Sequence, residues 1–437
     1  MKRGHSSYKK ALQYLYGLQK YGIKFGLNKT SNLMKAFGDP HKGQAYIHIA
    51  GSNGKGSVSA MMESILRKSG LKVGFYSSPH LVRFTERIRI NGEEIPPEKV
   101  ATLTEELISM MDPSDPPTFF EVTTAMALIY FSREKTDVAI VEVGMGGRLD
   151  ATNIIRPLVS VITNISLEHQ FFLGRRLVDI AGEKGGIIKP GVDLVTGATQ
   201  PNVLRLFQSL CKGKKAPFWK VGKDFRYRTK GSRVSYYGLK RRFQDIEIGL
   251  LGRFQARNAA IALGTTEIME KKGITISSRD VVDGLRDTNW PGRMHIVSRE
   301  PIIILDGAHN PAAIGRLADS VRHVYHYRRL ILVMGVMADK DIPGIIREII
   351  PIADRVIFTR PAYPRAAEPE VLMKAAEEYD KPATVIPTIP EALDRAKELS
   401  DAEDLILVCG SLFTVGEALT YFYPERYRPD EIEIEKP

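Results

Sequence analysis

The chain has 437 residues, of which 43% are hydrophobic and 26% are charged, values typical of a folded globular protein and not of a disordered one. This length predicts two or three domains, because a single hydrophobic core rarely grows beyond about 250–300 residues. The net charge of +11 fits a nucleic-acid partner, an anionic small substrate or simply a basic surface, and the sequence has no nucleic-acid-binding motif that would favour the first.

Apolar runs alternate with helical patterns along the chain, which is typical of parallel sheets joined by crossover helices. In the first two thirds we predict strands at 45–50, 137–143 and 157–164, and helices over 55–69, 118–131 and 255–271. The helix over 55–69 has one apolar face, and Gly70 is expected to stop it. Short polar segments that alternate between 224 and 249 predict an antiparallel ribbon.

The pair Pro291–Gly292 interrupts this pattern and predicts a domain boundary. A second series of strands is predicted at 302–305, 330–335, 355–359 and 404–409, with helices between them. The expected fold class is therefore α/β, with a phosphate-loop domain over 1–292 and a smaller Rossmann-like domain over 293–437. The Pro- and charge-rich residues from Pro424 onward are expected to fray.

The first segment with chemical meaning is the loop 51–57, which lies between the first predicted strand and helix. Its glycines let backbone N–H groups turn inward, the helix N-terminus adds its dipole, and Lys55 adds a positive charge, so we predict a phosphate site. The loop departs from the general pattern, because Ile49 stands at the first glycine position and Gly56 separates Lys55 from Ser57. The alternative is a glycine-rich turn without a ligand.

Two further loops follow predicted strands. Glu142 ends one strand before the glycine-rich segment 144–153, and a carboxylate there suits Mg²⁺, which usually takes one or two carboxylates together with phosphate and water. The segment 306–311 begins at the carboxyl end of another strand, where ligands bind in open α/β sheets. The alternative for Asp306 and Asn310 is a simple helix cap.

Together these loops resemble the folylpolyglutamate synthase/dihydrofolate synthase branch of the Mur ligase superfamily. The resemblance covers nearly the whole chain and is carried, in order, by segments 51–57, 76–81, 84–88, 144–153, 183–190, 257–260, 291–293, 306–311 and 410–413. It implies a Mur-ligase-like N-terminal domain and an amide ligation driven by ATP. A substrate carboxylate would attack the γ-phosphate of ATP and form an acyl phosphate with release of ADP. The amine of L-glutamate would then attack the acyl carbon and displace phosphate.

The resemblance also implies the cofactors and their ligands: ATP, two Mg²⁺ ions and a carbamylated lysine. Phosphate contacts are implied for Gly54, Lys55, Gly56 and Ser57, and other nucleotide contacts for Asn258, Arg293 and Asp306. The first Mg²⁺ would bind Ser78 and Glu142, and the second His169 and the carbamate of Lys184. The implied catalytic residues are Lys55, Lys184 and His309.

Spacing alone would assign no role to His169 or Lys184, because a lone histidine is usually a satisfied polar residue and a lone lysine is usually solvated. Lys189, five residues after Lys184, is expected to be an ordinary surface ammonium. The chain departs from residues common in the family at Lys24, Glu168, Gly185 and Phe254.

A pocket for the pteroate end of the substrate is implied at Phe25, Gly26, Thr118, Phe120, Asp150 and Ala151. Flat heteroaromatic rings stack well between such apolar side chains, although an aromatic residue at the start of an apolar helix, such as Phe120, is often ordinary core. We expect a bifunctional enzyme that adds glutamate to dihydropteroate and to folate. The alternatives are a monofunctional folylpolyglutamate synthase, another Mur-type amino-acid ligase, which should carry an additional N-terminal domain, and a P-loop ATPase that acts on nucleic acid.

The expected partners are small molecules: ATP, L-glutamate, and dihydropteroate or folate. We expect a cytoplasmic monomer with no nucleic-acid partner and no membrane association. No apolar stretch approaches the roughly 20 residues of a membrane span, and the basic N-terminus lacks the apolar core of an export signal. Only two cysteines, Cys211 and Cys409, are present, which fits a reducing compartment.

Overall fold

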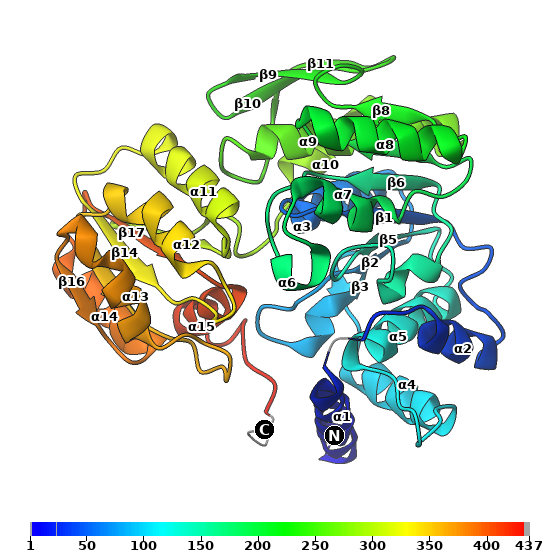
Figure 1. Ribbon diagram of the computed structural model, residues 1–437, viewed down its shortest axis with the longest axis horizontal. Helices are drawn as coiled ribbons and strands as arrows, with labels where there is room; N and C mark the ends of the chain where they lie inside the picture. Colours follow the sequence, from blue (N-terminus) through cyan, green and yellow to red (C-terminus); the bar gives the residue numbers. More distant parts are fainter. Residues whose placement is uncertain (1, 23, 432–437) are drawn as a thin grey trace.

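The computed structural model describes residues 2–22 and 24–431, and these residues form three β-sheets (Figure 1). The strands are β1 (Tyr46–Ala50), β2 (Val73–Tyr76), β3 (Ile88–Ile90), β4 (Glu93–Glu94), β5 (Val138–Glu142), β6 (Val159–Ile162), β7 (Asp193–Thr196), β8 (Phe218–Lys220), β9 (Arg226–Lys230), β10 (Arg233–Tyr237), β11 (Arg242–Glu247), β12 (His295–Arg299), β13 (Ile302–Asp306), β14 (Leu330–Met334), β15 (Arg355–Phe358), β16 (Ala383–Val385) and β17 (Leu405–Cys409).

The helices connect these strands and cover the sheets. They are α1 (Lys2–Gly17), α2 (Asn28–Ala36), α3 (Lys55–Lys68), α4 (Pro97–Ser109), α5 (Phe119–Arg133), α6 (Gln170–Leu173), α7 (Leu177–Gly185), α8 (Pro201–Gly213), α9 (Gln255–Lys271), α10 (Ser278–Arg286), α11 (Pro311–Val324), α12 (Ile342–Ile349), α13 (Pro369–Ala376), α14 (Ile389–Leu399) and α15 (Leu412–Phe422). Within the described part of the chain, none of these helices is long and apolar enough to cross a bilayer.

The large sheet has the order β4-β3-β2-β5-β1-β6-β7-β8, with β1 paired in parallel to β5 on one side and to β6 on the other. Successive side chains of β1 face opposite sides of the sheet: Ile47 and Ile49 pack with α3, α9 and α10, whereas Tyr46 packs with α1, α2, α4 and α5. The carboxyl ends of β1, β5 and β6 therefore meet at one edge, where the phosphate loop begins.

The second large sheet has the order β12-β13-β17-β14-β15-β16, and all its strands are parallel except the edge strand β12. Helices α11, α12 and α13 cover one face, and α14 and α15 cover the other. The predicted α/β class is confirmed, and so are the predicted strands, whose ends agree to within two residues. We propose the boundary between the two domains at 292/293, between the last helix of the first domain, α10, and β12.

Two further predictions concern the polar ribbon between 224 and 249 and the helix α3. The predicted ribbon is confirmed as the three-stranded antiparallel sheet β11-β10-β9. The predicted apolar face of α3 is confirmed as part of the core, and the opposite side of the helix is covered too, because every residue from Gly56 to Leu66 is buried. The helix lies between the sheet and the neighbouring helices α9 and α10, so its polar residues are covered as well as its apolar ones.

One buried carboxylate attaches the ribbon to the rest of the domain. Glu267 on α9 accepts hydrogen bonds from the Tyr236 hydroxyl, at 2.8 Å, and from the Lys240 N–H, at 2.7 Å. We expect Glu267→Ala to lower the free energy of unfolding by about 2–4 kcal/mol, because buried donors lose their acceptor. Urea unfolding measures this loss. Glu247→Ala, which removes only an exposed pair with Arg233, should cost less than about 1 kcal/mol, and equal losses in the two variants would contradict the prediction.

Candidate active site

The phosphate loop 51–57 joins β1 to α3, and its shape depends on glycine. Gly54 has φ +84°, and a Cβ there would lie 2.7 Å from Asn258 Oδ1. A Cβ at Gly51 would lie 1.9 Å from Thr163 Oγ1. No side chain caps the N-terminus of α3. The first N–H groups of this helix are therefore available for an anion, and the predicted phosphate contact Gly54 lies directly beside the predicted nucleotide contact Asn258.

Two lysines meet at the start of this loop. The Nζ atoms of Lys55 and Lys184 donate to the same acceptor, Gly51 O, at 3.0 and 3.1 Å. Lys184 is only 2% exposed, and its Nζ lies 2.7 Å from Glu168 Oε1. Burial lowers the pKa of Lys184, and the neighbouring Glu168 carboxylate opposes that shift. Lys184 therefore differs from the usual lone lysine, which is solvated, because α7 places it against the phosphate loop.

Lys189 also differs from expectation. It is half-buried and not fully exposed, and its Nζ donates to Asn153 O at 2.7 Å. Burial, together with the nearby Lys214 and Arg156 cations, lowers the pKa of Lys189 to about 8. It therefore differs from Lys184 in its partner, which is a backbone carbonyl and not a carboxylate.

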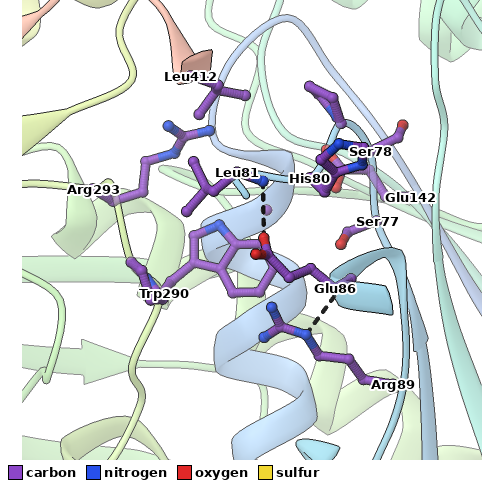
Figure 2. Close-up of a pocket in the computed structure, with 13 residues that line it drawn as sticks. Ser77, Ser78, His80, Leu81, Glu86, Arg89, Glu142, Trp290, Arg293 and Leu412 are labelled. Atoms are coloured by element: carbon purple, nitrogen blue, oxygen red, sulfur yellow. Dashed lines mark hydrogen bonds between the residues drawn. The ribbon is translucent and has the colours of Figure 1, made fainter. Parts of the chain in front are cut away.

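A pocket of about 40 Å³ brings together residues from both halves of the chain (Figure 2). Ser78 and Glu142 contribute to it from the first domain, and Arg293 contributes from the start of the second. Burial raises the pKa of Glu142, while the Lys55 and Arg293 cations and a backbone hydrogen bond from Ser78 lower it. A buried carboxylate with cations around it is a suitable ligand for a hard metal ion that neutralises its charge.

The chain does not supply a full metal shell by itself. In the described residues, no group of three or more His, Cys, Asp or Glu side chains could hold a metal ion. Mg²⁺ commonly completes its coordination with water and substrate phosphates. The predicted ligands Ser78 and Glu142 therefore fit a metal ion that arrives with a nucleotide better than a permanently bound one.

His169, the predicted ligand of the second metal ion, occupies a strained backbone position. Its φ of +44° lies in the left-handed region, which residues other than glycine rarely adopt, and it precedes the short helix α6. Burial lowers the pKa of His169 to about 4, although the adjacent Glu168 opposes the shift. The imidazole is therefore neutral at physiological pH, which is the form that binds metal ions.

In the second domain, Asp306 ends β13 and accepts hydrogen bonds from Met294 N and Ala308 N, each at 2.8 Å. It therefore does not cap a helix. The cap of α11 is Asn310, which accepts from Ala313 N at 2.9 Å. The helix-cap alternative is thus correct for Asn310 and wrong for Asp306.

Residues around this cap face the first domain. Asn310 Nδ2 donates to Asn53 Oδ1 at 3.0 Å and so joins α11 to the phosphate loop. His309 Nδ1 lies 2.8 Å from Gly307 O. Burial lowers the pKa of His309 to about 4, so the ring is neutral. Its Nδ1–H donates to Gly307 O, which leaves Nε2 as a hydrogen-bond acceptor.

The predicted pteroate residues lie around the glycine-rich loop. Thr118 caps α5, and Phe120 packs so closely that a Cβ at Gly144 would lie 2.4 Å from Phe120 Cζ. The Gly26 N–H donates to Leu149 O at 3.4 Å. The structure therefore brings both walls of the predicted pocket to one loop, although 92 residues separate Gly26 from Thr118.

Asp150 and Phe25, two of the predicted pteroate residues, differ in how accessible their side chains are to a ligand. Asp150 is buried, and its carboxylate accepts from Thr152 N at 3.0 Å and from Met145 N at 2.9 Å, so both oxygens have partners within the chain. Phe25 is 46% exposed and has its ring 5.9 Å from that of Phe172. Phe25 is therefore available to a ligand, whereas Asp150 holds the loop in shape. Ala151 is buried directly after Asp150.

Sequence reasoning missed two residues of this site. Glu168 stands out only as a departure from the family's common residue, and its ion pair with Lys184 was not predicted. Trp290, which directly precedes the predicted boundary pair Pro291–Gly292, lies against the start of α3, since a Cβ at Gly56 would lie 2.7 Å from its Nε1. The position of Glu168 directly before the predicted metal ligand His169 was a signal that could have placed it in the site. No local pattern indicated that Trp290 belongs to the site.

Comparison with known proteins identifies the family of the chain. The Mur ligase middle domain matches residues 49–266, and the Mur ligase glutamate ligase domain matches residues 292–412. The Bacillus subtilis dihydrofolate synthase/folylpolyglutamate synthase is 32% identical over 94% of this chain and 98% of its own length. A probable bifunctional folylpolyglutamate synthase/dihydropteroate synthase of Haloferax volcanii is 36% identical, and this chain spans only about half of its length, 50%.

Solved structures give the same result. The structure of E. coli FolC in complex with DHPP and ADP has a TM-score of 0.88 and 32% identity, and the match covers 95% of this chain and 98% of that one. A bifunctional folylpolyglutamate synthase/dihydrofolate synthase from Yersinia pestis, complexed with AMPPNP and a Mn ion, has a TM-score of 0.84 and 30% identity, with 94% and 96% covered. The chain belongs to the folylpolyglutamate synthase/dihydrofolate synthase family of the Mur ligases.

Proposed function

We propose that this protein is an ATP-dependent ligase that adds L-glutamate to dihydropteroate and to reduced folates through an acyl phosphate. The observation that carries the proposal is the pocket shared by Ser78, Glu142 and Arg293, which lies at the phosphate loop and draws on both domains. A bound triphosphate there would meet the N–H groups of α3 and the charge of Lys55. The relatives named above that bind ADP or AMPPNP support this assignment.

In this mechanism the chain's cations offset the repulsion between the substrate carboxylate and the phosphate oxygens that it attacks. Lys55 and Arg293 would hold the phosphates, Asn258 and Asp306 would contact the rest of the nucleotide, and neutral His309 would face the phosphates through Nε2. Ser78 and Glu142 would hold one Mg²⁺, and His169 with a carbamylated Lys184 would hold a second. When bound, these ions would supply further positive charge to the transferred phosphoryl group.

Closure of the second domain on the first would complete the site, because Arg293, Asp306 and His309 all follow the proposed boundary. Burial of the reacting groups also strengthens each electrostatic contact and keeps water from the acyl phosphate. We further propose that the protein acts as a cytoplasmic monomer, because ATP is supplied there and one chain contributes all the groups named. This scheme requires neither nucleic acid nor membrane.

The direct test is ATP turnover with L-glutamate and either dihydropteroate, tetrahydrofolate or no acceptor. We expect ADP release with both acceptors and none without. Release with tetrahydrofolate alone would indicate the monofunctional alternative. Turnover with a cell-wall nucleotide precursor and with neither folate acceptor would move the assignment to the other Mur ligases.

Asp150 tests whether the two acceptors use the site differently. We expect Asp150→Ala to lower kcat/KM about tenfold more for dihydropteroate than for tetrahydrofolate, because we propose that the carboxylate contacts the pteroate in addition to shaping the loop. Steady-state kinetics with each acceptor measure this ratio. Equal losses would mean that Asp150 only shapes the loop through its bonds to Thr152 and Met145, as its occupied oxygens also allow.

A further inference from the structure

A second cavity, of about 240 Å³, lies next to the pocket of Figure 2 and has no role in the mechanism above. The two share a wall, which consists of Leu81, Glu86, Arg89, Trp290 and Pro291. Helix α3 provides another side of the cavity through Glu63, Ser64 and Arg67, and Arg426 and Tyr427 contribute from the C-terminal segment. Its volume is below the roughly 300–1,000 Å³ of sites for drug-sized ligands, so a small metabolite is the appropriate size of occupant.

The C-terminal segment that borders the cavity is held in place. Tyr427 is only 7% exposed, Arg83 Nη1 donates to Arg426 O at 2.8 Å, and the Asp430 carboxylate accepts from Phe84 N at 2.8 Å. The prediction that this segment frays is therefore wrong for residues 424–431, and residues 432–437 lie outside the described part. The cavity has ordered walls on every side named here.

Two polar side chains of α3 reach the cavity without a hydrogen-bond partner. Glu63 and Ser64 are 8% and 2% exposed, and neither Glu63 Oε1 nor Ser64 Oγ has a partner within the described residues. The cation paired with Glu63, Arg67, has its Nε 3.8 Å from Oε1, which is beyond hydrogen-bond distance, and its Nη1 donates to Asn91 O. An unsatisfied buried polar group costs about 1–3 kcal/mol, so a donor on a molecule bound in the cavity would gain a favourable hydrogen bond here.

Two arginines on the cavity, Arg89 and Arg426, form no ion pair in the described part of the chain, although the Arg89 cation opposes the burial that raises the pKa of Glu63 and of Glu86. Arg89 Nε donates to Glu86 O at 3.1 Å, and its guanidinium lies 5.2 Å from the centre of the Trp290 ring. Arg426 lies 5.4 Å from the centre of the Tyr427 ring. The ion pairs that do form at this cavity use other arginines, Arg67 with Glu63 and Arg83 with Glu94.

The other charges that line this cavity are already engaged. Arg83 pairs with Glu94, at 2.7 Å, and Asp287 pairs with Lys68, also at 2.7 Å. The Glu86 carboxylate accepts from the N–H groups of Leu81, Val82 and Arg83. The groups left over are two guanidinium ions, one carboxylate oxygen and one hydroxyl. Their complement is a molecule with two carboxylates and one ammonium.

We propose that this cavity is a second small-molecule site that binds a dicarboxylic α-amino acid, with Arg89 and Arg426 contacting its carboxylates and Glu63 accepting from its ammonium group. Ser64 Oγ lies next to Glu63 on the α3 side of the cavity and would supply a further hydrogen bond. The inference rests on the proposed function only in its choice of probe, L-glutamate, because none of these residues belongs to the phosphate loop or the proposed metal ligands. Through the shared wall, an occupant would contact Arg89 and Trp290, which also line the pocket at Glu142.

Equilibrium dialysis with L-glutamate on the full, nucleotide-free chain tests the cavity, and the binding curve is analysed for two classes of site because L-glutamate is also the proposed substrate. Glutarate is the matched ligand that lacks the ammonium group. We expect Glu63→Gln to weaken L-glutamate binding at least about tenfold and to change glutarate binding by less than about twofold. Arg426→Gln should weaken both ligands at least about tenfold, because it removes a carboxylate contact. Arg428→Gln is the matched control, since Arg428 is exposed two residues further along, and it should change neither.

The proposal is overturned if L-glutamate does not bind, if Glu63→Gln binds it as tightly as the wild-type chain, or if Glu63→Gln weakens glutarate equally. Thermal unfolding of each variant checks its fold. Arg426 has an exposed side chain, so its variant keeps the test valid if Glu63→Gln does not fold. Failure of the proposed function is a separate result: it would appear as absent ADP release with both folate acceptors and would leave these dissociation constants unchanged.

Discussion

Lys55→Ala is expected to lower kcat/KM for ATP by about 10³-fold or more, because a charge-assisted contact to the transferred phosphate is lost where the transition state gathers negative charge. Lys55 is the first residue of α3, and its Nζ lies 3.0 Å from Gly51 O at the mouth of the phosphate loop. The loss should fall mainly on kcat if Lys55 acts on the transferred group, and mainly on KM if it only binds ATP. Steady-state ADP release with saturating L-glutamate and tetrahydrofolate separates the two.

Lys68→Ala is the matched control for this variant. Lys68 is the last residue of the same helix, and its Nζ pairs with Asp287 at 2.7 Å on the partly exposed surface. Its loss should leave kcat/KM within about twofold and cost less than about 1 kcal/mol of stability. If Lys55→Ala kept activity close to that of Lys68→Ala, the phosphate-loop assignment would be wrong.

Lys184→Ala is expected to abolish turnover, with partial recovery on addition of short carboxylic acids. We propose that the active enzyme carries a carbamate on Lys184, formed when the neutral amine takes up CO₂. Burial lowers the pKa of Lys184 and so favours the neutral form that reacts. The Glu168 carboxylate, 2.7 Å away, favours the ammonium form instead. A carbamate beside that carboxylate would be repelled unless a cation lay between them, so the modification should depend on Mg²⁺ and nucleotide.

Carbon-13 NMR with labelled bicarbonate measures this modification directly. We expect one carbamate signal, stronger in the presence of Mg²⁺ and ATP analogue, which is absent from Lys184→Arg and kept in Lys189→Arg. Lys189 is a strict control, because its pKa is also lowered, to about 8, yet its Nζ donates to the backbone carbonyl of Asn153 and not to a carboxylate. A signal that survives in Lys184→Arg, or full activity of Lys184→Ala without added acid, would refute the carbamate.

The sequence by itself determined the elements and the order of the loops. Strand β1 and helix α3 are marked by an apolar run, a glycine loop and a stop signal within 26 residues, so local periodicity and backbone preference suffice to predict them. The same holds for the segment around Glu142, which ends a buried strand. The ordered set of such segments is what made the family recognisable before any contact was known.

Only the tertiary structure decided how these residues are paired and charged. Lys184 meets Gly51 O across 133 positions of sequence, and Glu168 becomes its partner because α7 packs beneath the loop. The roles of Asp306 and Asn310 were likewise separated only by their hydrogen-bond partners. Ion pairing and pKa depend on distance and on removal of water, and both are set by packing between segments that lie far apart in the chain, which no local pattern encodes.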